Sequence, residues 1–329
     1  MAMPTLADVL HSAVPFALPL RRPFRGLEVR EGMLVKGPSG WGEFAPFDDY
    51  SDAAAARWLA SAVEASFGSW PAQVRDEIEV NAIIPAVDSA DAAGLAREAV
   101  LERGCRTIKV KVGSASLGDD EARVASVRDV LDTVLGRGRG AIRMDANGAW
   151  DVARGATALR RLGAYGIEYV EQPCRTRDEM RELRGLVDVP FAVDEVIRQA
   201  DTPVTSVADI ADVAVLKPAT LGGVAATLRL AEELDVPVVI SGSLDSSVGL
   251  ETALATAAAM PDLPFASGLG TGALFAADLV EPVVASGGTI AVRRTGPDLT
   301  ALLAARDRLS DERAAYWRQR LADAWAVKG

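Results

Sequence analysis

Short apolar segments recur along most of the chain at nearly even spacing, and this rhythm restricts the fold more than any other feature. The intervals of roughly 22 to 34 residues each suit one strand followed by one helix. Eight such units favour a closed (β/α)8 barrel, although an open doubly wound sheet has the same rhythm. From residue 78 onward the segments centre near Val80, Lys109, Arg143, Val170, Val193, Val215, Val239 and Ala266.

The chain before residue 78 has a different pattern, typical of an α+β unit. Apolar stretches at 16–20, 27–30 and 33–36 predict short strands, with Glu31-Gly32 as a hairpin turn. Residues 51–67 predict a helix that is capped by Ser51 and ended by Gly68. Residues 311–327 predict an amphipathic helix, which we expect to pack back onto this N-terminal part.

Charge and cysteine content exclude several classes of function. The balance of 46 acidic to 35 basic side chains, a net charge of −11, opposes binding to nucleic acid. Cys105 and Cys174 lie far apart, so they suggest a reducing compartment and no cysteine-rich metal site. No apolar run has the length of a membrane span, and no basic stretch precedes an apolar core near the N-terminus. We therefore expect a cytoplasmic protein that binds no membrane and no nucleic acid.

Histidine and lysine are both scarce. The single histidine, His11, argues against Ser-His-Asp, Cys-His and histidine-rich metal chemistry. Only five residues are lysines, so arginine supplies most of the positive charge. A lysine inside the fold therefore needs a reason, and one reason is that lysine can lose its proton whereas arginine cannot.

Charged residues stand at the ends of five consecutive apolar segments, where a parallel barrel forms its active site. Two lysines are two positions apart on one segment, so both can point inward. The set comprises Lys109 and Lys111 at the second segment, Asp145, Glu171 and Asp194 at the third to fifth, and Lys217 at the sixth.

This set of side chains suits one kind of chemistry. Three converging carboxylates repel one another in a partly buried site and need a cation. Oxygen ligands without histidine or cysteine predict a hard divalent ion, Mg²⁺, with Mn²⁺ as a substitute. A metal-held substrate carboxylate with a lysine facing its α-carbon suits proton abstraction through an enediolate. Taken singly, each acid could be a salt-bridge or helix-capping residue, and the two lysines could belong to a charged edge strand. The combination of all six residues favours an enzyme.

Two runs of small residues follow the last two barrel segments. Residues 241–247 follow the seventh segment and residues 267–272 follow the eighth. Such runs leave backbone amides able to bind an anionic group. They are equally typical of tight strand-to-helix turns.

These ordered motifs resemble the muconate-lactonizing subgroup of the enolase superfamily, and within it the o-succinylbenzoate synthase family. The resemblance implies a modified (β/α)8 TIM barrel at 78–290 under an α+β capping domain at 1–77, completed by about 291–329. It rests on Lys-Val-Lys at 109–111, Arg-Met-Asp-Ala-Asn-Gly at 143–148, Val-Glu-Gln-Pro at 170–173, Val-Asp-Glu at 193–195, Leu-Lys-Pro at 216–218, Ser-Gly-Ser-Leu-Asp-Ser-Ser-Val-Gly at 241–249 and, in the cap, Gly-Trp-Gly-Glu at 40–43.

The resemblance also implies a reaction on a small-molecule carboxylate, namely dehydration of 2-succinyl-6-hydroxy-2,4-cyclohexadiene-1-carboxylate to o-succinylbenzoate in menaquinone biosynthesis. Lys111 would take the proton α to the ring carboxylate, Lys217 would stabilise the enediolate, and Lys109 would assist orientation and charge. The implied Mg²⁺ ligands are Asp145, Glu171 and Asp194, and the implied substrate-binding residues are Arg143, Asn147, Ser241, Gly242, Ser243, Gly268 and Leu269, with backbone at 241–243 and 268–269 holding the succinyl carboxylate.

Other functions share the same first chemical step. An N-succinylamino acid racemase would use Lys111 and Lys217 as acid–base partners, and a cycloisomerase would also pass through an enediolate. A dipeptide epimerase usually has an acidic pair after the eighth segment, and residues 267–272 contain none. A non-enzymatic binding barrel is disfavoured because no lysine or acid of the set is lost. We expect a monomer, since no apolar segment indicates a large interface.

Overall fold

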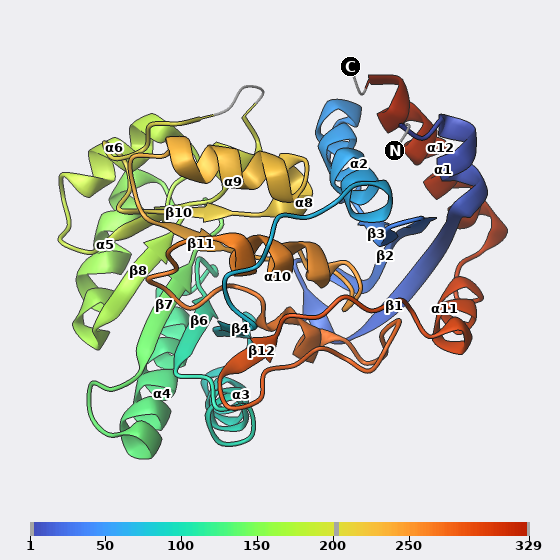
Figure 1. Ribbon diagram of the computed structural model, residues 1–329. Helices are drawn as coiled ribbons and strands as arrows, with labels where there is room; N and C mark the ends of the chain where they lie inside the picture. The colour runs from blue at the N-terminus through green and yellow to red at the C-terminus, as the bar shows by residue number, and fades with distance from the viewer. Residues whose placement is uncertain (1–2, 201–203, 328–329) are drawn as a thin grey trace.

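The computed structural model describes residues 3–200 and 204–327, and the larger of its two groups of elements is built on a parallel sheet (Figure 1). Seven strands pair in the order β11-β10-β9-β8-β7-β6-β5, so neighbours in sequence are neighbours in the sheet. The strands are β5 (Ala82–Ile84), β6 (Thr107–Lys111), β7 (Ala141–Asp145), β8 (Ile167–Glu171), β9 (Phe191–Val193), β10 (Val213–Leu216) and β11 (Val238–Ile240).

The eighth apolar segment closes this sheet into a ring through isolated bridges. Gly268 bridges Ser241, directly after β11, and Ser267 bridges Val80, directly before β5, both in parallel. A glycine is needed at 268 because a Cβ there would lie 2.5 Å from Ser241 Oγ. The (β/α)8 barrel prediction is therefore confirmed, with a very short eighth strand.

The first barrel strand begins slightly later than the apolar rhythm predicts. The segment centred near Val80 supplies β4 (Glu77–Glu79), which pairs antiparallel with β12 (Thr289–Ala291) outside the barrel sheet. Val80 itself bridges Ser267 of the ring, and pairing with β6 begins at Ala82, opposite Ile108. The C-terminal strand thus covers the entry of the chain into the barrel.

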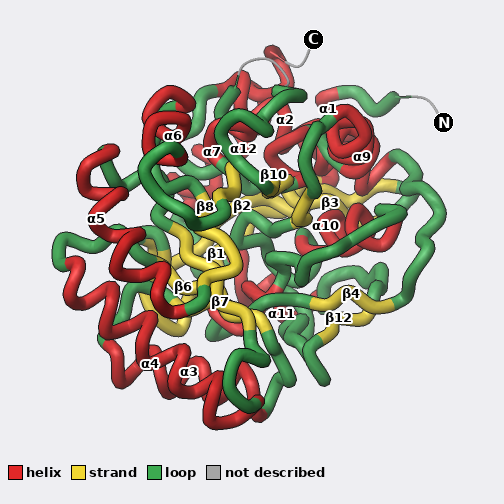
Figure 2. The backbone as a smooth tube through the Cα atoms, turned by 90° about the vertical axis from the view of Figure 1, so that its left-hand side faces the viewer, coloured by secondary structure: helices red, strands yellow, loops and turns green. Residues whose placement is uncertain are grey.

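Helices follow the barrel strands and lie along the outside of the sheet (Figure 2). Thr176 and Glu179 form a capping box at the start of one helix, and the helix that follows β6 is ended by Gly136. No helix in the described ranges is both long and apolar enough to cross a membrane. The barrel helices are α3 (Ser89–Leu101), α4 (Leu117–Leu135), α5 (Val152–Leu162), α6 (Arg177–Arg184), α7 (Glu195–Arg198), α8 (Pro218–Leu221), α9 (Val224–Glu233) and α10 (Leu250–Ala259), with short 3-10 turns η1 (Gly163–Tyr165) and η2 (Gly270–Leu274).

The second group combines both ends of the chain around its own apolar core. Helix α12 contacts α1 and α2, and α11 contacts β1, so the C-terminal helices complete the N-terminal sheet (Figure 1). Phe16, Phe44, Trp58 and Trp317 are among its buried side chains. Its elements are α1 (Leu6–Ser12), β1 (Ala13–Phe24), β2 (Leu27–Gly37), β3 (Gly40–Phe44), α2 (Asp52–Phe67), α11 (Leu299–Arg306) and α12 (Asp311–Val327), of which α2 with its Ser51 cap and α12 confirm the predicted helices.

The hairpin turn predicted at Glu31-Gly32 is wrong. Strand β2 runs straight through these residues, and the chain turns at Arg25-Gly26, where φ is 54° and 75°. A tight two-residue turn needs positive φ at both central positions, which these values satisfy. Gly32 instead permits close packing, because a Cβ there would lie 2.5 Å from the Cβ of Ala45.

Gly32→Ala should therefore lower the free energy of unfolding by about 1–3 kcal/mol, because the added methyl group overlaps Ala45 and Phe16. Gly94→Ala is the matched control: no atom lies within 4 Å of its Cβ position in α3, so alanine should stabilise the protein by up to about 1 kcal/mol. Urea denaturation followed by circular dichroism measures both. A Gly32→Ala variant as stable as Gly94→Ala would contradict the packing assignment.

Candidate active site

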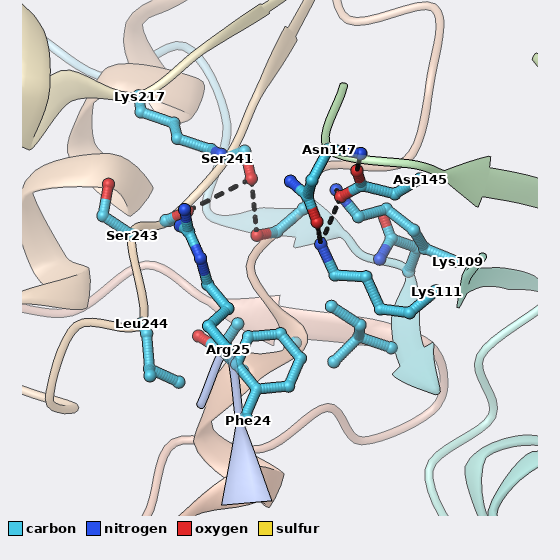
Figure 3. A pocket seen from close by; sticks show the side chains of 16 residues that line it. Phe24, Arg25, Lys109, Lys111, Asp145, Asn147, Lys217, Ser241, Ser243 and Leu244 are labelled. Atoms are coloured by element: carbon cyan, nitrogen blue, oxygen red, sulfur yellow. Dashed lines mark hydrogen bonds and ion pairs between the residues drawn. The ribbon is translucent and has the colours of Figure 1, made fainter. Parts of the chain in front are cut away.

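A pocket lies at the carboxyl ends of the barrel strands, facing the turn between β1 and β2 (Figure 3). The structure brings most of the predicted site residues into its lining: Lys109, Lys111, Asp145, Asn147, Lys217, Ser241, Gly242, Ser243 and Gly268. The lining also includes seven residues that were not predicted: Phe24, Arg25, Asn81, Ile83, Leu244, Gly270 and Thr271.

Both lysines of β6 point inward and meet the same carboxylate. Lys109 Nζ lies 2.9 Å from Asp145 Oδ2 and 2.7 Å from Glu171 Oε2. Lys111 Nζ lies 2.5 Å from Asp145 Oδ2 and donates to Asn147 Oδ1 at 2.6 Å. Strand register explains these contacts, because Lys111 is paired with Asp145 across β6 and β7, and Asp145 with Glu171 across β7 and β8.

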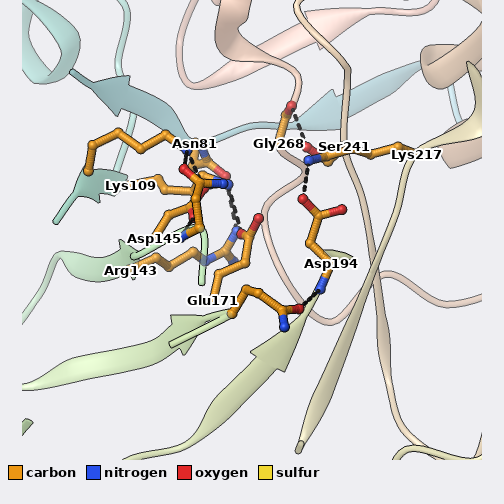
Figure 4. Close-up of polar contacts among 12 residues, drawn as sticks. Asn81, Lys109, Arg143, Asp145, Glu171, Asp194, Lys217, Ser241 and Gly268 are labelled. Atoms are coloured by element: carbon orange, nitrogen blue, oxygen red, sulfur yellow. Dashed lines mark hydrogen bonds and ion pairs between the residues drawn. The ribbon is translucent and has the colours of Figure 1, made fainter. Parts of the chain in front are cut away.

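Asp194, directly after β9, is held by cations on two sides. Lys217 Nζ lies 2.5 Å from its Oδ2, as Figure 4 shows, and Arg198 Nε lies 2.9 Å from its Oδ1. The backbone N–H of Asp194 donates to Gln172 Oε1 at 3.1 Å. The third predicted acid is therefore fixed in both side chain and backbone, on the side of the ring opposite the β6 lysines.

The charges of the cluster shift the pKa values of the two β6 lysines in opposite directions. Burial lowers the pKa of Lys111; Asp145 works against this, and the charge of Lys109 adds to it. Burial alone would also lower the pKa of Lys109, but the carboxylates of Asp145 and Glu171 outweigh it and raise that pKa. Burial would raise the pKa of Asp145, yet the two lysines hold it below its usual range. Lys111 is thus the lysine of the pair that gives up its proton more readily, as a base requires.

Two buried carboxylate oxygens have no hydrogen-bond partner within the described ranges, Glu171 Oε1 and Glu195 Oε2. Burial, together with the charge of Asp145, raises the pKa of Glu171, and burial with the charge of Asp194 raises that of Glu195 to about 8. Unpartnered carboxylate oxygens are costly to bury, and they are the donors that a hard divalent cation binds.

The carboxylates nevertheless do not surround a single point. Across residues 3–200 and 204–327, no three acidic, histidine or cysteine side chains are gathered closely enough to hold a metal ion. The ammonium group of Lys109 lies between Asp145 and Glu171, and the ammonium group of Lys217 contacts Asp194. The donor chemistry therefore fits a divalent cation, while the ion pairs keep the three acids apart.

Two residues implied to bind substrate lie outside the pocket lining. Arg143 is fully buried in the barrel interior, where it donates to Asn81 Oδ1 and Ala266 O, and pairs with Glu168. It shares a strand face with Asp145 but lies two residues, about 7 Å, further from the mouth of the barrel. Leu269 is also buried and does not line the pocket.

Four of the five backbone amides implied to hold the succinyl carboxylate are used within the protein. Those of Ser241, Gly242, Ser243 and Gly268 each donate a hydrogen bond to another protein group. By contrast, Ser243 Oγ and Thr271 Oγ1 are buried without a partner in the described part of the chain. Hydroxyl groups, and not these amides, are therefore the donors that this wall offers to a ligand.

The hairpin turn adds residues that sequence reasoning missed. Phe24 and Arg25 line the pocket (Figure 3), and Lys111 Nζ lies 5.7 Å from the centroid of the Phe24 ring. The guanidinium of Arg25 stacks on Phe47, 4.7 Å from the ring centroid, and finds no hydrogen-bond or ion-pair partner among the described residues. The signal was present as Arg25-Gly26, a suitable pair for a two-residue turn, but Glu31-Gly32 offered a competing one.

Two family models match the chain, Enolase N-terminal domain-like at residues 15–66 and Enolase C-terminal domain-like at residues 91–299. The o-succinylbenzoate synthase of Thermobifida fusca is 47% identical over 316 residues, which cover 95% of each chain. Those of Mycobacterium ulcerans and Mycolicibacterium smegmatis are 48% and 45% identical, and the matches cover 92% and 99% of this chain and 92% and 98% of the relatives.

Solved structures with the same fold are more distant in sequence. A muconate lactonizing enzyme from Pseudomonas fluorescens, complexed with muconolactone, has a TM-score of 0.75 at 22% identity, covering 89% of this chain and 97% of that one. An N-succinyl Arg/Lys racemase from Bacillus cereus has a TM-score of 0.74 at 18% identity, covering 89% and 96%. These structures show the fold alone. The family models and the near full-length relatives show that the chain belongs to the o-succinylbenzoate synthase family of the enolase superfamily.

Proposed function

We propose that this chain is a lyase that dehydrates 2-succinyl-6-hydroxy-2,4-cyclohexadiene-1-carboxylate to o-succinylbenzoate. The observation that carries the proposal is the near full-length similarity to o-succinylbenzoate synthases, in a chain that places Lys111 and Lys217 on opposite sides of one pocket. Lys111 ends the second strand of the ring and Lys217 follows the sixth, four positions away in a barrel of eight. The names of the relatives at 45–48% identity support the same reaction.

Lys111 is the base in this mechanism. In its neutral form it takes the proton from the carbon next to the ring carboxylate, and the electron pair moves into that carboxylate as an enediolate. The electron pair then returns to the ring and expels the neighbouring hydroxyl group. The proton on Lys111 leaves with this hydroxide as water, so the lysine ends the cycle neutral. A lowered pKa at Lys111 favours the neutral form that starts the reaction.

The other charges stabilise the enediolate without moving protons. Lys217 pairs with Asp194, and the carboxylates of Asp145 and Glu171 raise the pKa of Lys109 and keep it cationic. Asp145, Glu171 and Asp194 would hold Mg²⁺, which supplies further positive charge at the substrate carboxylate. The unpartnered Oε1 of Glu171 supports this ligand assignment.

The far side of the pocket suits the second carboxylate of the substrate. Arg25 brings a positive charge from the hairpin turn, and Ser243 and Thr271 bring hydroxyl groups. A charge-assisted hydrogen bond from a guanidinium to a carboxylate is among the stronger polar contacts. We propose that these three side chains hold the succinyl end.

The proposed product also bears on the pathway and the compartment in which the protein acts. We propose that the reaction belongs to menaquinone biosynthesis and takes place in the cytoplasm, as a reducing compartment suits the two buried, unpaired thiols Cys105 and Cys174. The monomeric state stays a prediction.

The second candidate function is racemisation of N-succinylamino acids. The opposed placement of Lys111 and Lys217 favours it specifically, because racemisation needs one acid–base group on each face of the α-carbon. The two functions differ in the fate of the enediolate, which loses hydroxide in one and regains a proton in the other.

Purified protein with Mg²⁺ should consume the cyclohexadiene substrate, followed as loss of its diene absorbance, at a kcat/KM of about 10⁴ M⁻¹s⁻¹ or more. Removal of divalent ions with EDTA should abolish turnover, and added Mg²⁺ should restore it. Polarimetry with N-succinylamino acids measures the second function in parallel. Absent dehydration alongside fast racemisation would overturn the lyase proposal in favour of the racemase.

Arg25→Ala should raise KM for the same substrate by about 10- to 100-fold, the loss expected for one hydrogen bond to a charged group. The kcat should change little, since Arg25 is proposed to bind the succinyl carboxylate and not the carboxylate that carries the enediolate. Arg22→Ala is the matched control, because Arg22 lies near the same hairpin turn but pairs with Asp91 instead of lining the pocket. Equal KM values for both variants would remove Arg25 from the substrate site.

A further inference from the structure

Glu43 lies near the end of β3, outside the barrel. Its carboxylate nevertheless binds a loop of the barrel. The side chain is buried, with 6% of the residue exposed. Its Oε2 accepts a hydrogen bond from the backbone N–H of Ser246 at 3.1 Å, and also from the Ser246 hydroxyl. Ser246 Oγ in turn accepts from the N–H of Gly249 at 3.1 Å. One carboxylate of the N-terminal group therefore organises the turn that leads into α10.

A second residue of the N-terminal group holds the start of the same loop. Arg30 of β2 is 2% exposed, and its Nε donates to the carbonyl oxygen of Leu244 at 3.0 Å while another nitrogen donates to Ala45 O. Leu244 has a φ of 62°, a conformation that costs energy for a leucine. Such a residue persists only where its surroundings hold it in place.

This loop forms one wall of the pocket. Ser243 and Leu244 line the pocket directly, and the Ser243 amide is bound by Asp245 Oδ2 at 2.8 Å. A shift of the backbone at 244–246 would therefore move the unpartnered Ser243 hydroxyl. These residues form no strand pairing, because β11 ends at Ile240. Asp278 holds the neighbouring Ser247 through its backbone N–H and its hydroxyl, so Glu43 and Arg30 act on the part of the loop that precedes Ser247.

We propose that Glu43 is a positioning residue that sets the pocket wall for the end of the substrate remote from the lysines. This inference rests on the proposed function for the identity of the substrate, though not for the placement of the loop. Glu43 does not line the pocket, so its effect passes through Ser246 to Ser243 and Leu244. Loss of the carboxylate should weaken substrate binding far more than the chemical step.

Burial, followed by the charge of Asp245, raises the pKa of Glu43 to about 8, so an uncharged side chain of the same shape suits the site. Glutamine keeps an oxygen for the Ser246 amide. Glu43→Gln is therefore the conservative variant, and Glu43→Ala removes the contact. Ser246→Ala removes only the hydroxyl link and keeps the protein testable if Glu43→Ala does not fold.

Glu251 offers a matched control on α10. It is also buried, at 2% exposure, and it also accepts bonds from the backbone N–H and the hydroxyl of one residue, Thr295, at 2.6 and 2.7 Å. Glu251 does not line the pocket. Glu251→Ala therefore removes the same kind of side-chain contact between two parts of the chain, but from the segment at Thr295 and not from the loop at 243–249.

Steady-state kinetics and hydrogen–deuterium exchange test the proposal together on the full chain. Glu43→Ala, or Ser246→Ala, should raise KM about tenfold with kcat within about threefold of wild type, while Glu43→Gln stays close to wild type. Exchange at 243–249 should rise in Glu43→Ala and stay unchanged in Glu251→Ala. Unchanged KM and unchanged exchange in the Glu43 and Ser246 variants would overturn the proposal, as would an equal rise in KM for Glu251→Ala.

The experiment distinguishes an error in the proposed function from an error in the proposed role of Glu43. If the wild-type protein does not turn over the cyclohexadiene substrate, the exchange measurement still decides the placement of the loop. Faster exchange at 243–249 in Glu43→Ala alone would then support the positioning role and contradict only the substrate.

Discussion

The structure depends on the pairing of lysine ammonium groups with carboxylates at the mouth of the barrel. Asp145, Glu171 and Asp194 are each at most 1% exposed, and their charges could not be buried side by side without cations. Lys109, Lys111 and Lys217 supply these cations at 2.5 to 2.9 Å. Burial lowers the pKa of Lys111, whereas the two paired carboxylates raise that of Lys109, and this difference supports the proposed roles of Lys111 as base and Lys109 as fixed cation.

This pairing requires that consecutive strands be neighbours in the sheet. The residues come from five consecutive strands, and Lys217 meets Asp194 only because β9 and β10 are neighbours in the sheet. The N-terminal group then covers the open end, with Arg25 over the pocket and with Glu43 and Arg30 fixing the loop at 243–249. The barrel thus sets the positions of the charged side chains. The shape of the pocket, by contrast, depends on residues from both groups of elements.

The features that were predictable from sequence are those that depend on local periodicity. The strand rhythm placed the acids at strand ends, and alternation on β6 placed Lys109 and Lys111 on one face. The features that were missed depend on contacts between distant segments. Gly32 reads as a turn residue but serves close packing against Ala45, and Arg143 shares the inward face of Asp145 but lies deeper.

The wall of the pocket is a further feature that depends on contacts between distant segments and could not be predicted from the sequence. A run of small residues such as 241–247 indicates open backbone amides, and whether those amides stay open depends on partners elsewhere in the chain. The carbonyl oxygens of Leu216 and Gly268 accept from the amides of Ser241 and Gly242, and the hydroxyl of Ser243 is left without a partner among the described residues. No local pattern distinguishes these two outcomes.

The central claim is that a neutral lysine at the end of β6 removes the substrate proton, and Lys111→Arg tests it most directly. Arginine keeps a positive charge beside Asp145 but cannot lose its proton. The account predicts a folded variant, with a melting temperature close to that of the wild type, whose kcat for the cyclohexadiene substrate falls by about 10²- to 10⁴-fold. A Lys111→Arg variant with near wild-type kcat would contradict the account.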